Sequence, residues 1–227
     1  VGTANSRRSM GFGVSTSSRC AVFTQSQDNV GDSAADTGYR TDCIIGTLTT
    51  AGAVDGLLDI SSVDADGVTF VVDDQFGSHI TIFVLALGGS DITDAYVGNF
   101  QYNSSSASHN ITAPGFQPDC AFFLSGSWSD AIPAAFGWSQ FSFGAAAGAT
   151  PTNAVLWGGA EDAVPTMDTA GYCKTGECAV GVNSDVGTLD IRAYISAWLS
   201  TGFTVSYNEQ GLGGSGNYYV FYLALKG

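Results

Sequence analysis

The chain of 227 residues repeats part of its own sequence. Four stretches recur in the same order, at offsets of 133 to 138 residues. The pairs are Arg19–Gln25 with Asn153–Gly159 (Ala21 aligned on Ala154), Gly38-Tyr39 with Gly171-Tyr172, Gly67–Val72 with Gly202–Tyr207, and Phe83–Gly89 with Phe221–Gly227. Because the offset drifts only where loops differ in length, the repeat predicts two copies of one structural unit.

The repeated stretches have the composition of β-strands. Ala121–Leu124, Thr69–Val72, Ile80–Leu85 and Tyr218–Leu223 are rich in β-branched and aromatic residues. Turn-forming residues separate them at spacings typical of all-β sandwiches. Ile191–Trp198 alternates only in part, and a short helix is the alternative there. We therefore expect an all-β fold of two tandem, related, jelly-roll-like β-sandwich units, at residues 1–92 and 93–227.

The first unit lacks a front part that the second unit has. The second unit contains residues 95–124, including the apolar stretch Gly115–Leu124, and the first has no counterpart to it. Met10–Gly13 aligns only roughly with Phe136–Ser139. Because the first unit shares the rest of the pattern, we expect a vacant strand position beside Arg19–Gln25. An open apolar sheet edge promotes aggregation, so we also expect this position to be filled. Residues upstream of Val1, a strand donated by a neighbouring subunit, or another protein would fill it.

The charge balance argues against two classes of partner. The net charge is −14, and the seven Lys and Arg residues are scattered along the chain. Binding to nucleic acid or to an anionic membrane surface needs clustered cations. The longest apolar run, Ile80–Leu87, is too short to cross a bilayer. We expect neither nucleic acid nor a membrane as a partner.

The sequence shows no arrangement typical of a catalytic centre. His79 begins an expected strand and His109 lies in an expected Ser-rich loop, and neither has a convincing nucleophile nearby in sequence. The Gly211–Gly216 stretch matches GxGxxG, but an expected strand follows it where a nucleotide site needs a helix. We expect no catalytic residues and no bound cofactor.

The five cysteines also favour a structural role. No CxxC pair exists, and both histidines are distant from the cysteines in sequence, which argues against a transition-metal site. Five buried thiols are the preferred interpretation. A disulfide between Cys173 and Cys178 is the alternative.

Acidic residues around Asp64-Ala-Asp-Gly67 form the only candidate metal site. Asp59, Asp64 and Asp66 could supply carboxylate oxygens to calcium. The matching turn of the second unit, Ser200–Gly202, lacks these carboxylates. A plain Asp-Gly turn is therefore the preferred interpretation.

Aromatic residues in loops raise the alternative of glycan binding. Trp138, Trp157 and Trp198 lie in strand-like stretches and are expected in the core. Trp128 lies in a Ser-rich loop and is the candidate glycan contact.

Several strings resemble a family of repeated β-domains in virion structural proteins of tailed phages and prophages. They are Gly115–Leu124, Met10–Ser15, Asp55–Phe70 and Phe83–Gly89. They resemble that family's pattern of a Gly-Phe-x-Pro motif, an apolar strand, a Gly-Phe-Gly strand, an Asp-Gly-Phe-Thr strand and a closing Leu-Ala-Leu-Gly-Gly strand. The middle of the second unit, 161–187, departs from it.

The resemblance implies a non-enzymatic virion component on the particle surface. Capsid decoration, a head fibre and a tail-associated protein are all consistent with it. The expected partners are further copies of the chain and other virion proteins. A glycan-binding module that contacts host surface glycans, or an extracellular filament subunit assembled by strand donation, is the alternative.

Overall fold

The computed structural model describes residues 5–27, 34–102, 106–126, 134–137, 139–160, 169–181, 189–210 and 218–227. All regular secondary structure in these residues is β-strand, as the sequence predicts. The strands of the first half are β1 (Asn5–Gly13), β2 (Arg19–Gln27), β3 (Ala34–Arg40), β4 (Ile45–Leu48), β5 (Val54–Asp64) and β6 (Gly67–Asp74). The others are β7 (Asp94–Gln101), β8 (Ser108–Ile111), β9 (Cys120–Ser125), β10 (Ala134–Gly137), β11 (Ser139–Ala147), β12 (Thr152–Ala160), β13 (Thr169–Thr175), β14 (Ala179–Gly181), β15 (Ile191–Leu199), β16 (Gly202–Gln210) and β17 (Tyr219–Lys226).

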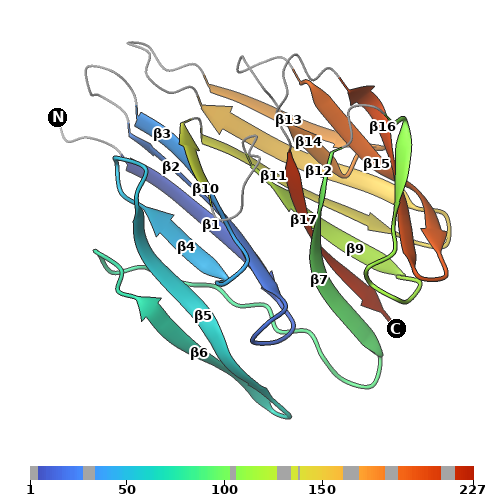
Figure 1. The fold of residues 1–227 in the computed structure, drawn as a ribbon, viewed down its shortest axis with the longest axis horizontal. Helices are drawn as coiled ribbons and strands as arrows, with labels where there is room; N and C mark the ends of the chain where they lie inside the picture. The colour runs from blue at the N-terminus through green and yellow to red at the C-terminus, as the bar shows by residue number, and fades with distance from the viewer. Residues whose placement is uncertain are drawn as a thin grey trace.

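The described strands form four antiparallel sheets. Sheet A has the order β1-β2-β3-β10, sheet B β4-β5-β6, sheet C β13-β12-β11-β9-β17-β7, and sheet D β14-β15-β16-β8. Figure 1 shows sheets A and B on one side of the molecule and sheets C and D on the other. This arrangement is compatible with a β-sandwich-like fold.

Sheet A packs on both faces, which explains why β2 is so apolar. Neighbouring side chains of a strand point to opposite faces. Phe23 therefore joins Leu57 of β5 in one buried cluster, while Val22 joins Leu124 of β9 in another. Burial on both faces accounts for the continuous apolar run in β2, where a half-exposed strand would alternate.

The largest core lies between sheets C and D. Phe203 of β16 makes edge-to-face contacts with Phe123 of β9 and Tyr222 of β17, at ring-centroid distances of 5.9 and 5.1 Å. All three side chains are almost fully buried. Trp157 is buried in a smaller cluster beside Val155 and Val180.

The two halves share a strand order. Strands β1, β2 and β3 pair in sequence, as do β4, β5 and β6; the series β11–β13 and β14–β16 pair in the same way. The hairpins β5–β6 and β15–β16 also carry β-bulges at positions 135 residues apart. The bulges fall at Leu57/Leu58 and Ile60/Ser62 in the first hairpin, and at Arg192/Ala193 and Ile195/Ala197 in the second.

In each half, another segment of backbone crosses close to a glycine of the first strand in the series. A Cβ added at Gly11 of β1 would overlap the carbonyl oxygen of Ile44, and one added at Gly144 of β11 would overlap that of Cys178. The amides of Ile44 and Cys178 donate to β5 and β15, at 2.9 and 2.8 Å. Glycine is needed in both strands because the crossing backbone occupies the space of a side chain.

Three expectations and one alternative need correction. The short-helix alternative for Ile191–Trp198 is wrong: the segment lies in strand β15, and its alternate residues fill the core between sheets C and D. Phe136 lies in β10, which pairs with β3, so the counterpart of β1 in pairing order is β11. Both edges of β2 are paired, so no position beside Arg19–Gln25 is vacant.

The fourth correction concerns Ile80–Leu85, which forms no strand. Its sequence favours β structure, but a strand needs neighbouring backbone groups to hydrogen-bond with. The described structure places no such strand beside it.

Candidate functional site

Strand β1 has one unpaired edge. It pairs with β2 over its whole length, and no described strand pairs with its other edge. Its counterpart β11 lies between β12 and β9 and pairs with both. The open edge of β1 therefore presents backbone donors and acceptors, whereas the equivalent groups of β11 are hydrogen-bonded to β9.

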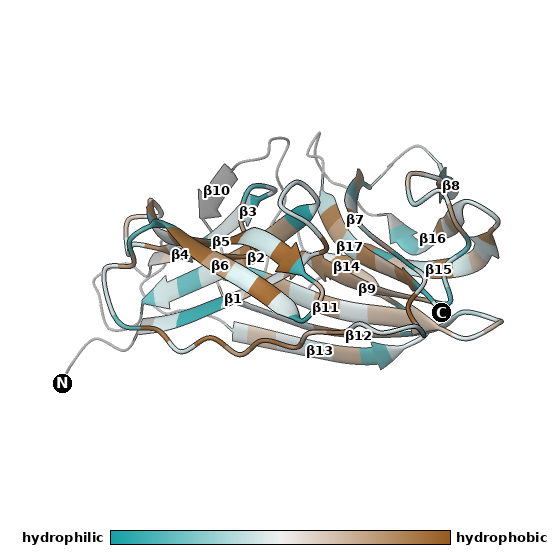
Figure 2. Cartoon of the chain, turned by 90° about the horizontal axis from the view of Figure 1, so that it is seen from below, coloured by the Kyte–Doolittle hydropathy of each residue, from teal (hydrophilic) through white to brown (hydrophobic). Residues whose placement is uncertain are grey.

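An apolar segment runs along the molecule near this edge. In Ile80–Leu87, Phe83 is 93% exposed and Leu85 is 82% exposed. Figure 2 shows the connection from β6 to β7, which contains this segment, as a long unpaired stretch that is brown over much of its length. Such a concentration of exposed large apolar side chains is typical of an interaction surface.

A groove separates β1 from this segment, and we call it the β1 groove. Strand β1 forms one wall and Ser78–Leu87 the other, while Ile45, Ile60 and Phe70 of sheet B line the space between them. It comprises two adjoining cavities of about 830 and 330 Å³. The smaller cavity is lined almost entirely by apolar residues.

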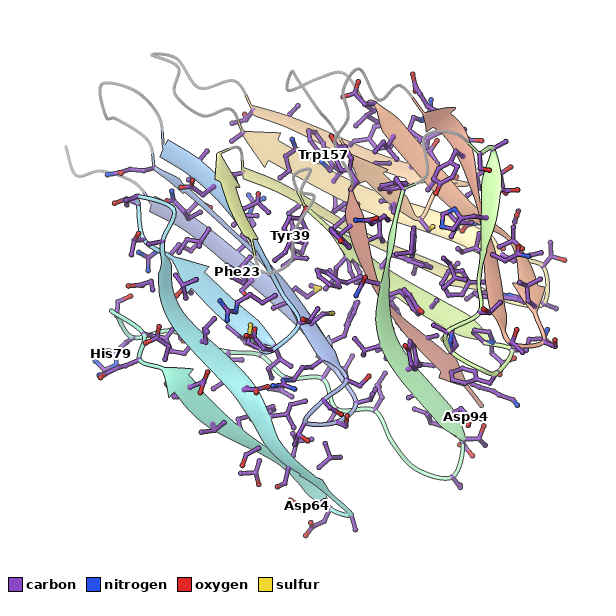
Figure 3. The ribbon with its side chains drawn as sticks, in the orientation of Figure 1. Phe23, Tyr39, Asp64, His79, Asp94 and Trp157 are labelled. Carbon is purple, nitrogen blue, oxygen red and sulfur yellow. The ribbon has the colours of Figure 1, made fainter. Side chains whose placement is uncertain are left out.

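The polar end of the β1 groove is basic. Arg7, Arg8 and His79 line it there, and Arg7 forms an ion pair with Asp55 at 2.9 Å. His79 lies at the outer edge of the molecule in Figure 3. The groove thus offers backbone hydrogen bonds along one wall, apolar contacts along its length and positive charge at one end.

A second polar cluster is built around Glu177, whose side chain is fully buried. Arg192 donates two hydrogen bonds to it, at 2.9 and 2.5 Å, and the Tyr172 hydroxyl donates another at 2.9 Å. Lys174 is 3.3 Å away. Burial alone would raise the pKa of Glu177, but these donors outweigh it and hold the pKa below its usual value.

A cavity of about 530 Å³ lies beside this cluster. Tyr172, Lys174, Arg192 and Glu209 line it, together with Trp157. Because Arg192 also pairs with Glu209, the charges at the mouth of the cavity are largely compensated by one another. This arrangement ties sheets C and D together.

The structure separates the calcium candidates. Asp59 pairs with Arg19 of β2, whereas Asp64 lies at the tip of the β5–β6 hairpin and accepts a hydrogen bond from Ser62 at 2.9 Å (Figure 3). Asp66 lies in the exposed turn. Among the described residues, no three acidic, His or Cys side chains gather as a metal site would require.

The structure describes two of the four tryptophans. Trp157 is buried, as expected, and Trp198 packs against the core and donates to the Gly148 carbonyl at 2.8 Å. Trp128, the candidate glycan contact, and Trp138 lie outside the described residues, as does Gly211–Gly216.

His109 and the buried cysteines have structural surroundings. His109 lies in strand β8, so the expected loop there is wrong; its Nδ1 is 2.9 Å from the Tyr207 hydroxyl, and burial lowers its pKa. All five cysteines are free. Cys20, Cys43 and Cys178 are buried as expected, and burial raises the pKa of the Cys20 thiol to about 12. Cys173 is exposed and Cys120 is only partly buried, so the expectation of five buried thiols is wrong at these two positions. The alternative of a disulfide between Cys173 and Cys178 is not formed.

Two features of the structure were not predicted from the sequence. The pairing of Glu177 with Arg192 joins residues distant in sequence, and no local pattern signals it. The β1 groove did have a signal, namely the missing counterpart of Gly115–Leu124, but the vacancy lies beside β1 and not beside β2.

Comparisons of the chain with protein-family models, with curated proteins and with solved structures return no match. Within the residues that the structure describes, no helix has the length and apolarity needed to span a membrane.

Proposed function

We propose that the chain is a non-enzymatic structural component of a tailed-phage virion, exposed on the particle and held there by contacts at the β1 groove. The observation that carries this proposal is the apolar segment Ile80–Leu87 beside the open edge of β1. A stable soluble protein rarely leaves such a surface uncovered, so a permanent neighbour accounts for it.

The proposal includes an internal duplication. Its support is the shared strand order, the matched bulges of the two hairpins, and the equivalent glycines Gly11 and Gly144. Bulges are specific features that related structures retain. Repeated β units with few charges suit a particle surface, where many polar contacts recur by symmetry.

The chain's place in a particle can be tested with antibodies raised against the purified protein. Immunogold labelling of intact particles should decorate their surface, and mass spectrometry should find the chain in a copy number that matches a particle symmetry. Purified particles without the chain, or with the chain only inside, would overturn the proposal.

The role of the β1 groove can be tested in the same particles. The double substitution Phe83→Asp with Leu85→Asp should lower incorporation by about tenfold or more, because charge on the groove wall disfavours an apolar contact. The matched control is Leu156→Asp, at an exposed apolar position of β12 outside the groove. Equal loss in both variants would show a general effect of added charge.

A filament subunit assembled by strand donation is the second candidate, and the open edge of β1 favours it. Electron microscopy of the purified chain distinguishes the two. Filaments formed by the chain alone would support this candidate against the virion component.

A further inference from the structure

Strand β9 shows how the fold fills the position that is open beside β1. In sheet C, β9 lies between β11 and β17 and pairs antiparallel with both. Its sequence, Cys120-Ala-Phe-Phe-Leu-Ser125, carries no charge. Phe123 lies opposite Gly144 of β11 and is buried in the core between sheets C and D.

The β1 groove has the same two walls, and no strand among the described residues lies between them. By pairing order, β1 corresponds to β11. By sequence, Phe83-Val-Leu-Ala-Leu corresponds to Phe221-Tyr-Leu-Ala-Leu of β17. Both walls line the groove, and sheet B lies below it as sheet D lies below β9.

Burial distinguishes the two corresponding segments. Phe221 of β17 is fully buried against Val22 and Tyr39 of sheet A, whereas Phe83, its counterpart in the repeated sequence, is 93% exposed. The two segments have nearly the same sequence and differ in their neighbours. Burying exposed apolar area stabilises by about 25 cal/mol per Å², so an added strand would find a strong apolar driving force here.

Building on the proposed function, we infer that the β1 groove binds an extended segment of a neighbouring protein chain whose sequence has the chemistry of β9. The bound segment runs antiparallel to β1 and pairs with its open edge, as β9 does with β11. Its large apolar side chain lies opposite Gly11, above Ile60 and Phe70. It is uncharged over about six residues, since the apolar part of the groove offers no partner for a charge.

A foreign segment fits this position better than a second copy of the chain does. The β9 strand of each copy is already paired on both edges, so donating it would open the same vacancy in the donor. The open edge of β1 extends over nine residues, or about 30 Å at the usual rise per residue. That length accommodates a full strand, and backbone pairing supplies affinity while the apolar positions supply specificity.

The test uses a synthetic peptide with the sequence of residues 115–126, Gly-Phe-Gln-Pro-Asp-Cys-Ala-Phe-Phe-Leu-Ser-Gly, kept under reducing conditions. Fluorescence anisotropy should detect saturable binding of the labelled peptide to the purified chain. Hydrogen exchange should slow in Asn5–Gly13 and Ile80–Leu87, the two walls, and stay unchanged in β9 and β11. Unchanged exchange there excludes displacement of the chain's own β9.

Two matched changes make the result specific. A peptide carrying Asp at the position of Phe123 should bind at least about tenfold more weakly, because it would bury a charge opposite Gly11. The chain with Phe83→Asp and Leu85→Asp should also bind weakly, while the Leu156→Asp chain should bind as the unchanged protein does. Circular dichroism confirms that each variant is folded.

The inference is overturned if the peptide does not bind at about 1 mM, the limit of weak specific affinity. It is also overturned if protection appears away from the two walls, or if the chain forms a dimer that itself covers Ile80–Leu87. Failure to bind, or protection elsewhere, leaves the chain's occurrence on particles standing, because immunogold labelling and mass spectrometry test it separately. A dimer that covers Ile80–Leu87 would also remove the groove contact from the proposed function. Conversely, a chain absent from particles that still binds the peptide would refute only the proposed function.

Discussion

At the scale of single residues, Glu177 is a charged side chain that connects several elements from a buried position. Charged residues make up only 12% of the sequence, yet this carboxylate is fully buried. A buried carboxylate is tolerated when donors satisfy it. Arg192, Tyr172 and Lys174 do so here, and they connect β13, β15 and the turn that precedes β14.

Replacing Glu177 by Gln should lower the free energy of unfolding by about 2 kcal/mol at pH 7, because charge-assisted hydrogen bonds become neutral ones. Urea denaturation measures this difference. The control is Glu209→Gln, since Glu209 is half-exposed and lies 3.4 Å from Arg192; its effect should stay within about 0.5 kcal/mol.

The pH dependence of this effect has a definite sign. The pKa of Glu177 is lowered in the folded state, so its contribution is present above the unfolded-state pKa of about 4.3 and is lost as the pH falls through the folded value. The stability difference between the unchanged protein and Glu177→Gln should therefore shrink below about pH 4. A difference that grows on acidification would contradict the ion-pair account.

At the scale of elements, sequence reasoning succeeded where a strand's partners lie within the chain. The stretches at Ala121–Leu124 and Thr69–Val72 lie within strands, and Tyr218–Leu223 does so from Tyr219 onward. Ile80–Leu85 has the same composition but no strand partner among the described residues. Composition reports the preference of a segment, whereas a strand also requires a neighbour, and only the structure shows whether one is present.

Phe83 and Phe221 form a natural pair for testing this difference. Phe221→Ala should destabilise the protein by about 3–5 kcal/mol, because a fully buried phenyl ring is removed. Phe83→Ala should change stability by less than about 0.5 kcal/mol, because its ring is exposed. Thermal unfolding with urea titration measures both. A large loss for Phe83→Ala would mean that the segment is packed within the isolated chain.

At the scale of the whole molecule, the repeat predicted two related halves but not how they join. The boundary between 1–92 and 93–227 stays a prediction. Among the contacts that cross it, β10 pairs with β3, and Val22 and Tyr39 share a buried cluster with Leu124 and Phe221. Repeat periodicity carries no information on such a junction, because each copy contributes a different face to it.

This shared cluster predicts that the described halves unfold together. Leu124→Ala should lower the free energy of unfolding by about 2–5 kcal/mol and shift the transition of both halves, because its side chain packs between sheet A and sheet C. All four tryptophans belong to residues 93–227, so their fluorescence follows that half. Hydrogen exchange of β2 follows the other half.

Coincident transitions, displaced together by Leu124→Ala, are expected of one cooperative unit. If β2 opens at a lower urea concentration and Leu124→Ala moves only the fluorescence transition, the halves are independent. The cluster would then be a contact between two separately stable units.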